Sequence, residues 1–136
     1  MIKPVCKDLS ILSKPSTPAT VFDLQTAKDL KDTLGFHKHE CVGMAANMIG
    51  ISKRIIVFDD NGTYTTMFNP EIISANDEYS AQEGCLSLSG LRNTKRFYHI
   101  RVRFQDSNFK WNEKDYSDWS AQIIQHEIDH CNGILI

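Results

Sequence analysis

The segment His126-Glu127-Ile128-Asp129-His130, close to the C-terminal end, constrains both the local fold and the chemistry of this chain. On a helix, residues four apart lie about 40° apart around the axis, so His126 and His130 would project from one face at a spacing that suits one metal ion. Glu127 could then reach a water on that ion without being a ligand, as a general base does. The pattern predicts a late helix with part of a hydrolytic metal site. The apolar residues beside it disfavour the alternative, an exposed polar helix.

Capping signals predict where the helices begin and end. Asp23 is expected to cap a helix over residues 24–34 that Gly35 ends, and the first 22 residues are expected to form an extended arm with a loop at 13–18. The late helix is expected to begin at Ser117 or Ser120 and to stop at Asn132-Gly133.

Between the helices, alternating apolar residues and turn signals predict strands. These strands are expected over 53–58, over 63–69 with an end or bulge at Pro70, over 97–105, and from 109 onward, with turns at 60–62 and 106–108. The order of elements predicts an α+β fold in which antiparallel β-sheets pack around the late helix, with one N-terminal helix.

The bulk properties exclude several classes of protein. The length of 136 residues fits a single domain spanning residues 1–136. A net charge of −2 with scattered basic residues gives no basis for nucleic-acid binding, and the basic stretch 92–103 is interpreted as the solvated face of a strand pair. No apolar run is long enough for a membrane span, and the N-terminus lacks the features of a secretion signal.

These features favour a cytoplasmic protein, and they set the expectation for its cysteines. In a reducing compartment Cys6, Cys41, Cys85 and Cys131 are expected to be thiols or metal ligands; two disulfides are the alternative.

A third metal ligand must come from upstream of the late helix, because only six residues follow His130. The candidates there are Cys6, Cys41, Cys85, His37, His39, His99 and the carboxylates. Cys131 adjoins His130 but lies about 100° from it around the helix and is expected to point elsewhere. Cys85 follows Gly84, which permits tight backbone geometry beside a buried ligand. One cysteine with two histidines is a known catalytic ligand set that keeps one position open for water.

Three segments resemble the motifs of peptide deformylases. The family motifs are G-x-G-L-A-A-x-Q, E-G-C-L-S and Q-H-E-x-D-H, and this chain has residues 41–48 (CVGMAANM), 83–87 (EGCLS) and 125–130 (QHEIDH) in the same order. The second and third match fully. In the first, Cys41 replaces a glycine, Met44 replaces a leucine, and Met48 replaces the glutamine whose amide helps to stabilise the oxyanion in the family.

The resemblance implies an enzyme that removes the formyl group from N-formylmethionyl peptides of nascent proteins and releases formate. It implies Cys85, His126 and His130 as ligands of one divalent ion, with Fe2+ in the cell and Zn2+, Ni2+ or Co2+ as further candidates. Glu127 would be the general base and the backbone N–H of Leu86 would support the oxyanion. Peptide substrate, presented at the ribosome, would pair through its backbone with Val42 and Gly43 as an added strand, with Leu86 and Ile123 in the methionine pocket.

Two other functions remain open at this level. Met48 motivates a deformylase-like protein with weak or no deformylase activity, which would act on another amide or serve as a binding module. Asn47 is expected to face away from the site and not to replace the missing donor. A purely structural zinc site is the second alternative, and it would require a fourth protein ligand.

Overall fold

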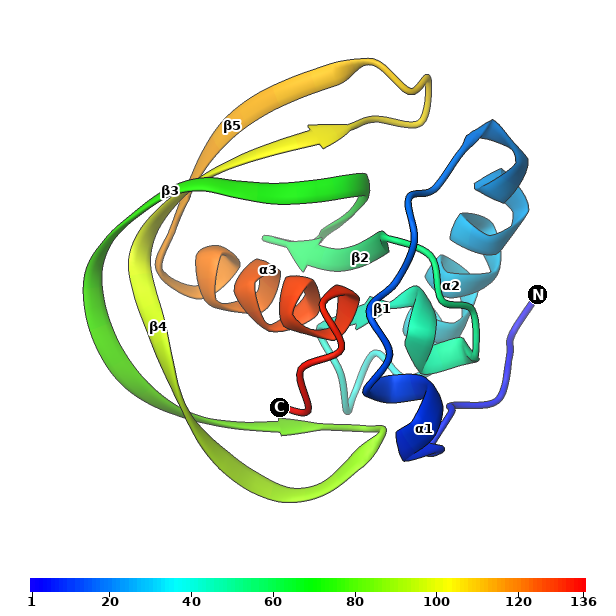
Figure 1. Cartoon of the computed structure of the whole chain (residues 1–136), viewed down its shortest axis with the longest axis horizontal. Coiled ribbons are helices and arrows are strands. Elements are labelled where there is room, and N and C mark those ends of the chain that lie inside the picture. Colours follow the sequence, from blue (N-terminus) through cyan, green and yellow to red (C-terminus); the bar gives the residue numbers. More distant parts are fainter.

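The computed structural model describes residues 1–136 and contains one five-stranded antiparallel sheet whose strands lie in chain order (Figure 1). The strands are β1 (Gly43–Ala45), β2 (Ile55–Asp60), β3 (Thr63–Cys85), β4 (Leu88–Gln105) and β5 (Trp111–Ser117). The helices are α1 (Leu9–Leu12), α2 (Leu24–Phe36) and α3 (Asp118–Cys131), with short 3-10 helices at Val21–Asp23 and Ala46–Ile49. The expected α+β class, with antiparallel strands around a late helix, is confirmed.

A long hairpin of β3 and β4 bends around α3, as Figure 1 shows in green and yellow. Its pairing is interrupted between Phe68 and Glu71, between Ile72 and Ser74, and between Glu83 and Cys85. The expected bulge at Pro70 is confirmed, and Asn69 beside it has a positive φ of 52°. Irregularities of this kind bend a strand and increase its twist, which lets the hairpin curve over the helix.

The sheet is covered on both faces, which explains the apolar run in β2. Ile56 and Phe58 pack in a cluster with residues of α3, whereas Ile55 and Val57 pack in a second cluster with residues of α2. Successive side chains of a strand point to opposite faces, so a strand between two helices must be apolar at every position. This arrangement places α3 between β2 and the bent part of the β3–β4 hairpin of the same sheet.

The structure corrects several expectations at the N-terminal side. Residues 9–12 form α1, capped by Asp8, within the segment expected to be extended. The side chain of Asp23 does not cap α2; it accepts from the backbone of Thr20 in a capping box on the preceding 3-10 helix. Gly35 does not end α2, which continues to Phe36.

The later turns and helix ends agree better with the expectations. Asn61 and Gly62 have positive φ at the β2–β3 turn. The turn before β5 is held by Asp106, whose carboxylate accepts from the backbone of Asn108 and Lys110, although β5 begins at Trp111 and not at 109. Helix α3 starts after Ser117 and ends before Gly133, as predicted. None of the helices has the length and apolar character required to cross a membrane.

Candidate metal centre and catalytic site

Cys85, His126 and His130 converge on one point, and their ligand atoms all lie within 4.8 Å of one another. The Nε2 atoms of the two histidines are 3.1 Å apart, and Cys85 Sγ is 3.4 Å from His130 Nε2. Tetrahedral coordination of one ion by two imidazoles and a thiolate requires separations of roughly 3.3 Å and 3.6 Å. The three side chains therefore fit one divalent metal ion. Burial and the neighbouring His126 lower the pKa of His130 to about 3, which keeps its ring neutral as coordination requires.

Cys85 reaches this point from the last position of β3. The chain turns at Leu86 and Ser87 and returns as β4, with Cys85 paired to Leu88. Of the other sulfur and imidazole candidates, none joins the cluster, and all four cysteines are free thiols, as expected for the cysteines of this chain. Cys131 is fully buried in the hydrophobic cluster of α3, as predicted from its angle on the helix.

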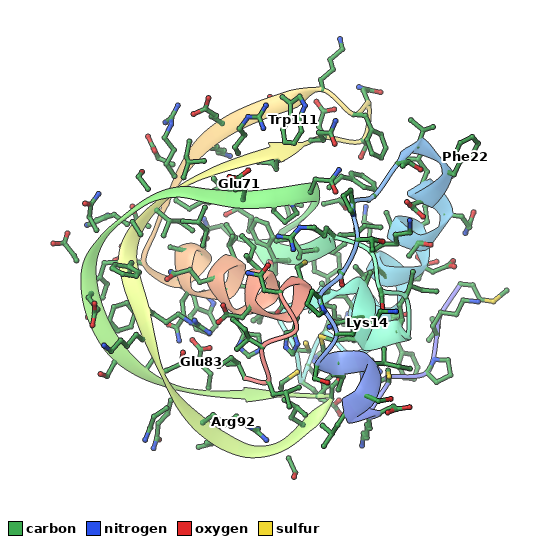
Figure 2. The ribbon with its side chains drawn as sticks, viewed as in Figure 1. Lys14, Phe22, Glu71, Glu83, Arg92 and Trp111 are labelled. Carbon is green, nitrogen blue, oxygen red and sulfur yellow. The ribbon has the colours of Figure 1, made fainter.

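Glu83 contacts the candidate ligand His126 at the ring nitrogen that faces away from the cluster, and no motif spacing had singled out Glu83 as a functional residue. Its carboxylate accepts a hydrogen bond of 2.8 Å from His126 Nδ1 and pairs with Arg96 on β4 at 2.7 Å and 2.9 Å. Arg96 also pairs with Asp129 at 2.8 Å. Glu83 lies on β3 of the bent hairpin, near α3 (Figure 2), and its side chain reaches His126 of that helix. A carboxylate at Nδ1 fixes the tautomer, so that Nε2 is the ligating atom.

The interpretation of residues 92–103 as a solvated face is wrong for Arg96, which is only 3% exposed. Its guanidinium is buried because it lies between two carboxylates from two different elements. The signal in the sequence was the position of Glu83, a charged residue two positions before the candidate ligand Cys85 in the EGCLS motif.

Glu127 is buried beside the three candidate ligands, and its Oε1 has no hydrogen-bond partner in the protein. Burial raises the pKa of Glu127 to about 7 against the opposing charge of His126. A carboxyl group with a pKa near the working pH is suited to accept and return a proton. Gly43 lies directly over it: a Cβ at this position would come 2.9 Å from Glu127 Oε2 and 2.8 Å from Ile123.

A cavity of about 610 Å³ opens in front of these groups. Its lining includes the candidate ligands Cys85 and His126, the general-base candidate Glu127, and the sequence-predicted Val42, Gly43, Leu86 and Ile123. His130 is fully buried behind them. Met48 also lines the cavity, whereas the amide of Asn47 donates to the backbone carbonyl of His130 at 2.9 Å, away from the cavity as expected.

The edge strand β1 borders the cavity and pairs only with β2. The carbonyl of Val42 accepts a hydrogen bond from the amide of Asp59, so it faces β2 and is not available to pair with a peptide, contrary to the prediction for Val42. Because hydrogen-bonding groups alternate along an antiparallel strand, the backbone groups of Gly43 face the open edge. The side chain of Cys41 donates to the Gly43 carbonyl at 2.8 Å.

A Cys–His–His cluster beside a buried glutamate, on an α+β fold, defines a metal-dependent hydrolase. The family model of polypeptide deformylase matches residues 2–136. The chain belongs to this family.

Individual peptide deformylases match this chain over nearly its whole length. The peptide deformylase of Clostridium beijerinckii is 46% identical over 136 residues, covering 100% of both chains. The crystal structure of the Thermotoga maritima peptide deformylase superposes with a TM-score of 0.89 at 30% identity, covering 99% of this chain and 95% of that one. The Met-Ala-Ser-bound class I type b peptide deformylase of Acinetobacter baumannii gives a TM-score of 0.88 at 28% identity, covering 99% and 97%.

Proposed function

We propose that this chain removes the N-formyl group from N-formylmethionyl peptides, with one metal ion held by Cys85, His126 and His130. As a member of the polypeptide deformylase family it is a metal-dependent hydrolase that acts on formylated nascent peptides. The observation that carries the assignment of residues is the convergence of the three ligand atoms beside the buried carboxylate of Glu127.

Fe2+ is the ion that we propose for the cell, with Zn2+, Ni2+ and Co2+ as replacements, because two imidazoles and a thiolate suit all four. When bound, the ion supplies Lewis-acid chemistry, lowering the pKa of water from about 15.7 toward about 7 and polarising the formyl group. Burial keeps the imidazole of His130 neutral, and the carboxylate of Glu83 orients the ring of His126 through Nδ1 so that Nε2 faces the ion.

Glu127 is the group that moves protons in this proposal. Its unpartnered Oε1 is free to accept a proton from the attacking water, and the same carboxyl then delivers it to the departing amine. The backbone N–H of Leu86, in the turn directly after Cys85, donates to the oxyanion that develops on the formyl oxygen.

The peptide backbone pairs with Gly43 as an additional strand on the open edge of β1, and Val42 and Ile123 contact its side chains. The absence of a Cβ at Gly43 matters here, because it lets β1 itself lie directly against Glu127 and Ile123. Residues 1–136 form one domain in this proposal, since both hydrophobic clusters share one sheet. The proposed setting is the cytoplasm, with nascent chains presented at the ribosome and no nucleic-acid binding by the chain itself.

Met48 favours a second candidate, a deformylase-like protein with weak activity. Its thioether cannot donate a hydrogen bond, and loss of one oxyanion donor costs about 10²–10³ in turnover. A pure binding module is less favoured, because binding alone does not require a general base such as Glu127.

Formate release from formyl-Met-Ala-Ser by anaerobically purified protein, with metal content measured on the same sample, tests the proposal. We expect stoichiometric metal and multiple turnovers. A fully metal-loaded protein without turnover would contradict the proposed substrate and favour action on another amide.

A further inference from the structure

The amide of Gln122 is held from both ends in the wall of the cavity. Its Nε2 donates to Glu83 Oε2 at 2.9 Å, and its Oε1 accepts from the hydroxyl of Tyr79 at 3.2 Å. Tyr79 is itself fixed by stacking on Tyr98, with ring centroids 4.0 Å apart and planes at 21°. The two contacts decide which end of the amide is the donor, because a carboxylate can only accept.

Gln122 lies one helical turn before His126 and beside Ile123, and all three line the cavity. Trp119, three residues earlier, lines it as well. Residues three and four apart share one face of a helix, so this face of α3 forms a continuous wall leading away from the candidate ligands. Ahead of His126 along this wall, Trp119 and Ile123 are apolar and Gln122 is polar.

One N–H of this amide is not engaged by Glu83. An amide nitrogen carries two protons, and the contact with Glu83 uses one of them. The carboxylate of Glu83 already accepts from His126 and Arg96 in addition to Gln122. The second proton of Gln122 has no acceptor in the protein and lies between the apolar side chains of Trp119 and Ile123 in the cavity lining, where an acceptor on the ligand is favoured over a hydrocarbon.

We infer that Gln122 selects formylated substrates whose first side chain ends in a hydrogen-bond acceptor, and that the site consequently accepts formyl-methionine sulfoxide as well as formyl-methionine. This inference rests on the proposed function and adds the preference of its side-chain subsite. The thioether of methionine is a weak acceptor, a sulfoxide oxygen is a strong one, and norleucine of the same length is none. The order of preference at this contact is sulfoxide, thioether, norleucine.

The test compares formyl-Met-Ala-Ser, its sulfoxide and its norleucine analogue as substrates of the wild-type protein and of Gln122→Met. The ratio of kcat/KM for sulfoxide over norleucine should fall about three- to tenfold in Gln122→Met, the size expected for one neutral hydrogen bond. Because the two kcat/KM values in each ratio come from the same variant, a general loss of activity that follows from the broken contact with Glu83 does not change the ratio.

Gln82→Met is the matched control, because Gln82 also lines the cavity but lies exposed on β3. Its ratio should equal that of the wild type. Binding of the three deformylated peptides, followed by the fluorescence of Trp119 in a Trp111→Phe background, provides a readout that does not depend on turnover and should show the same change.

The outcomes separate the two proposals. An unchanged ratio in Gln122→Met, with formate released from formyl-Met-Ala-Ser, overturns the role of Gln122 and leaves the deformylase assignment intact. Absence of formate release from all three peptides overturns the proposed substrate. The relative affinities for the three deformylated peptides then still decide whether Gln122 distinguishes a side chain that ends in a hydrogen-bond acceptor from one that does not.

Discussion

Glu127 combines burial with one carboxylate oxygen that has no hydrogen-bond partner in the protein. Such an oxygen costs free energy unless a ligand uses it, which is the physical basis for assigning Glu127 a catalytic role and not a structural one.

Glu127→Gln should retain the fold and the metal and lose at least about a hundredfold in turnover, because an amide can neither accept nor return the proton. The measurement is kcat for formate release together with metal content and Tm. If the variant hydrolyses formyl-Met-Ala-Ser at nearly the wild-type rate, the general base is another group.

Cys85→Ser should change the metal preference of the site and greatly weaken activity, since a largely protonated hydroxyl replaces a thiolate. Metal content after reconstitution with Fe2+ or Zn2+ measures this directly. Cys6→Ser is the control, because Cys6 lies outside the ligand cluster. Equal metal content in both variants would remove Cys85 from the ligand set.

Met48→Gln tests whether the departure from the family motif limits this protein. Met48 lines the cavity and is 1% exposed. A glutamine there would donate to the oxyanion and should raise kcat about tenfold, less than a full donor effect because the surroundings fit a thioether. Met48→Leu, which has a similar volume and no donor, should give no gain. An equal gain in both variants would show that packing, and not the missing donor, is limiting.

At the scale of elements, the C-terminal end of α3 depends on contact with the N-terminal segment. Gly133 has a φ of +74°, and a Cβ there would lie 2.5 Å from the backbone oxygen of Ser13. The glycine is required both for the left-handed conformation that ends the helix and for the close approach of a second backbone.

Gly133→Ala should lower the free energy of unfolding by more than about 2 kcal/mol, because the cost of a positive φ adds to a clash with backbone. Gly50→Ala is a matched control, since Gly50 has a φ of +83° with no atom within 4 Å of the added Cβ. It should cost only about 1 kcal/mol. Equal costs, measured by denaturant unfolding, would mean that the approach to Ser13 adds nothing.

At the scale of the whole molecule, Arg96 ties the bent hairpin to α3. It is 3% exposed and bridges Glu83 of β3 and Asp129 of α3. Its charge is compensated only when β3, β4 and α3 are all in place, so the ion pairs couple the wrapping of the hairpin to the position of His126.

Arg96→Met should destabilise the fold by about 3–5 kcal/mol, because it leaves the buried carboxylate of Glu83 without a cation. Arg101→Met removes an exposed arginine of the same strand that pairs with Glu113 and Asp115, and it should leave Tm essentially unchanged. Similar Tm values for the two variants would contradict the role of Arg96 as the tie between hairpin and helix.

The sequence by itself determined those features that depend on neighbours a few residues away. The helical spacing of His126 and His130, the turn at Asn61-Gly62 and the stop at Gly133 follow from backbone geometry within one or two turns. The deformylase motifs likewise identified the family, because they record residue types at fixed local spacings.

Only the tertiary structure decided the extent of the β3–β4 hairpin and the surroundings of the site. Residues 71–82 of β3 lack the alternation of a half-buried strand, because they are exposed or only partly buried on both faces. Their pairing is specified by the partner strand β4. Gly35 remains helical, although its residue type is typical of a helix end. The joining of Glu83, Arg96 and Gln122 behind His126 connects residues 13 to 43 positions apart. No local pattern encodes such contacts, because a buried charge is stabilised by whichever partners the fold brings to it.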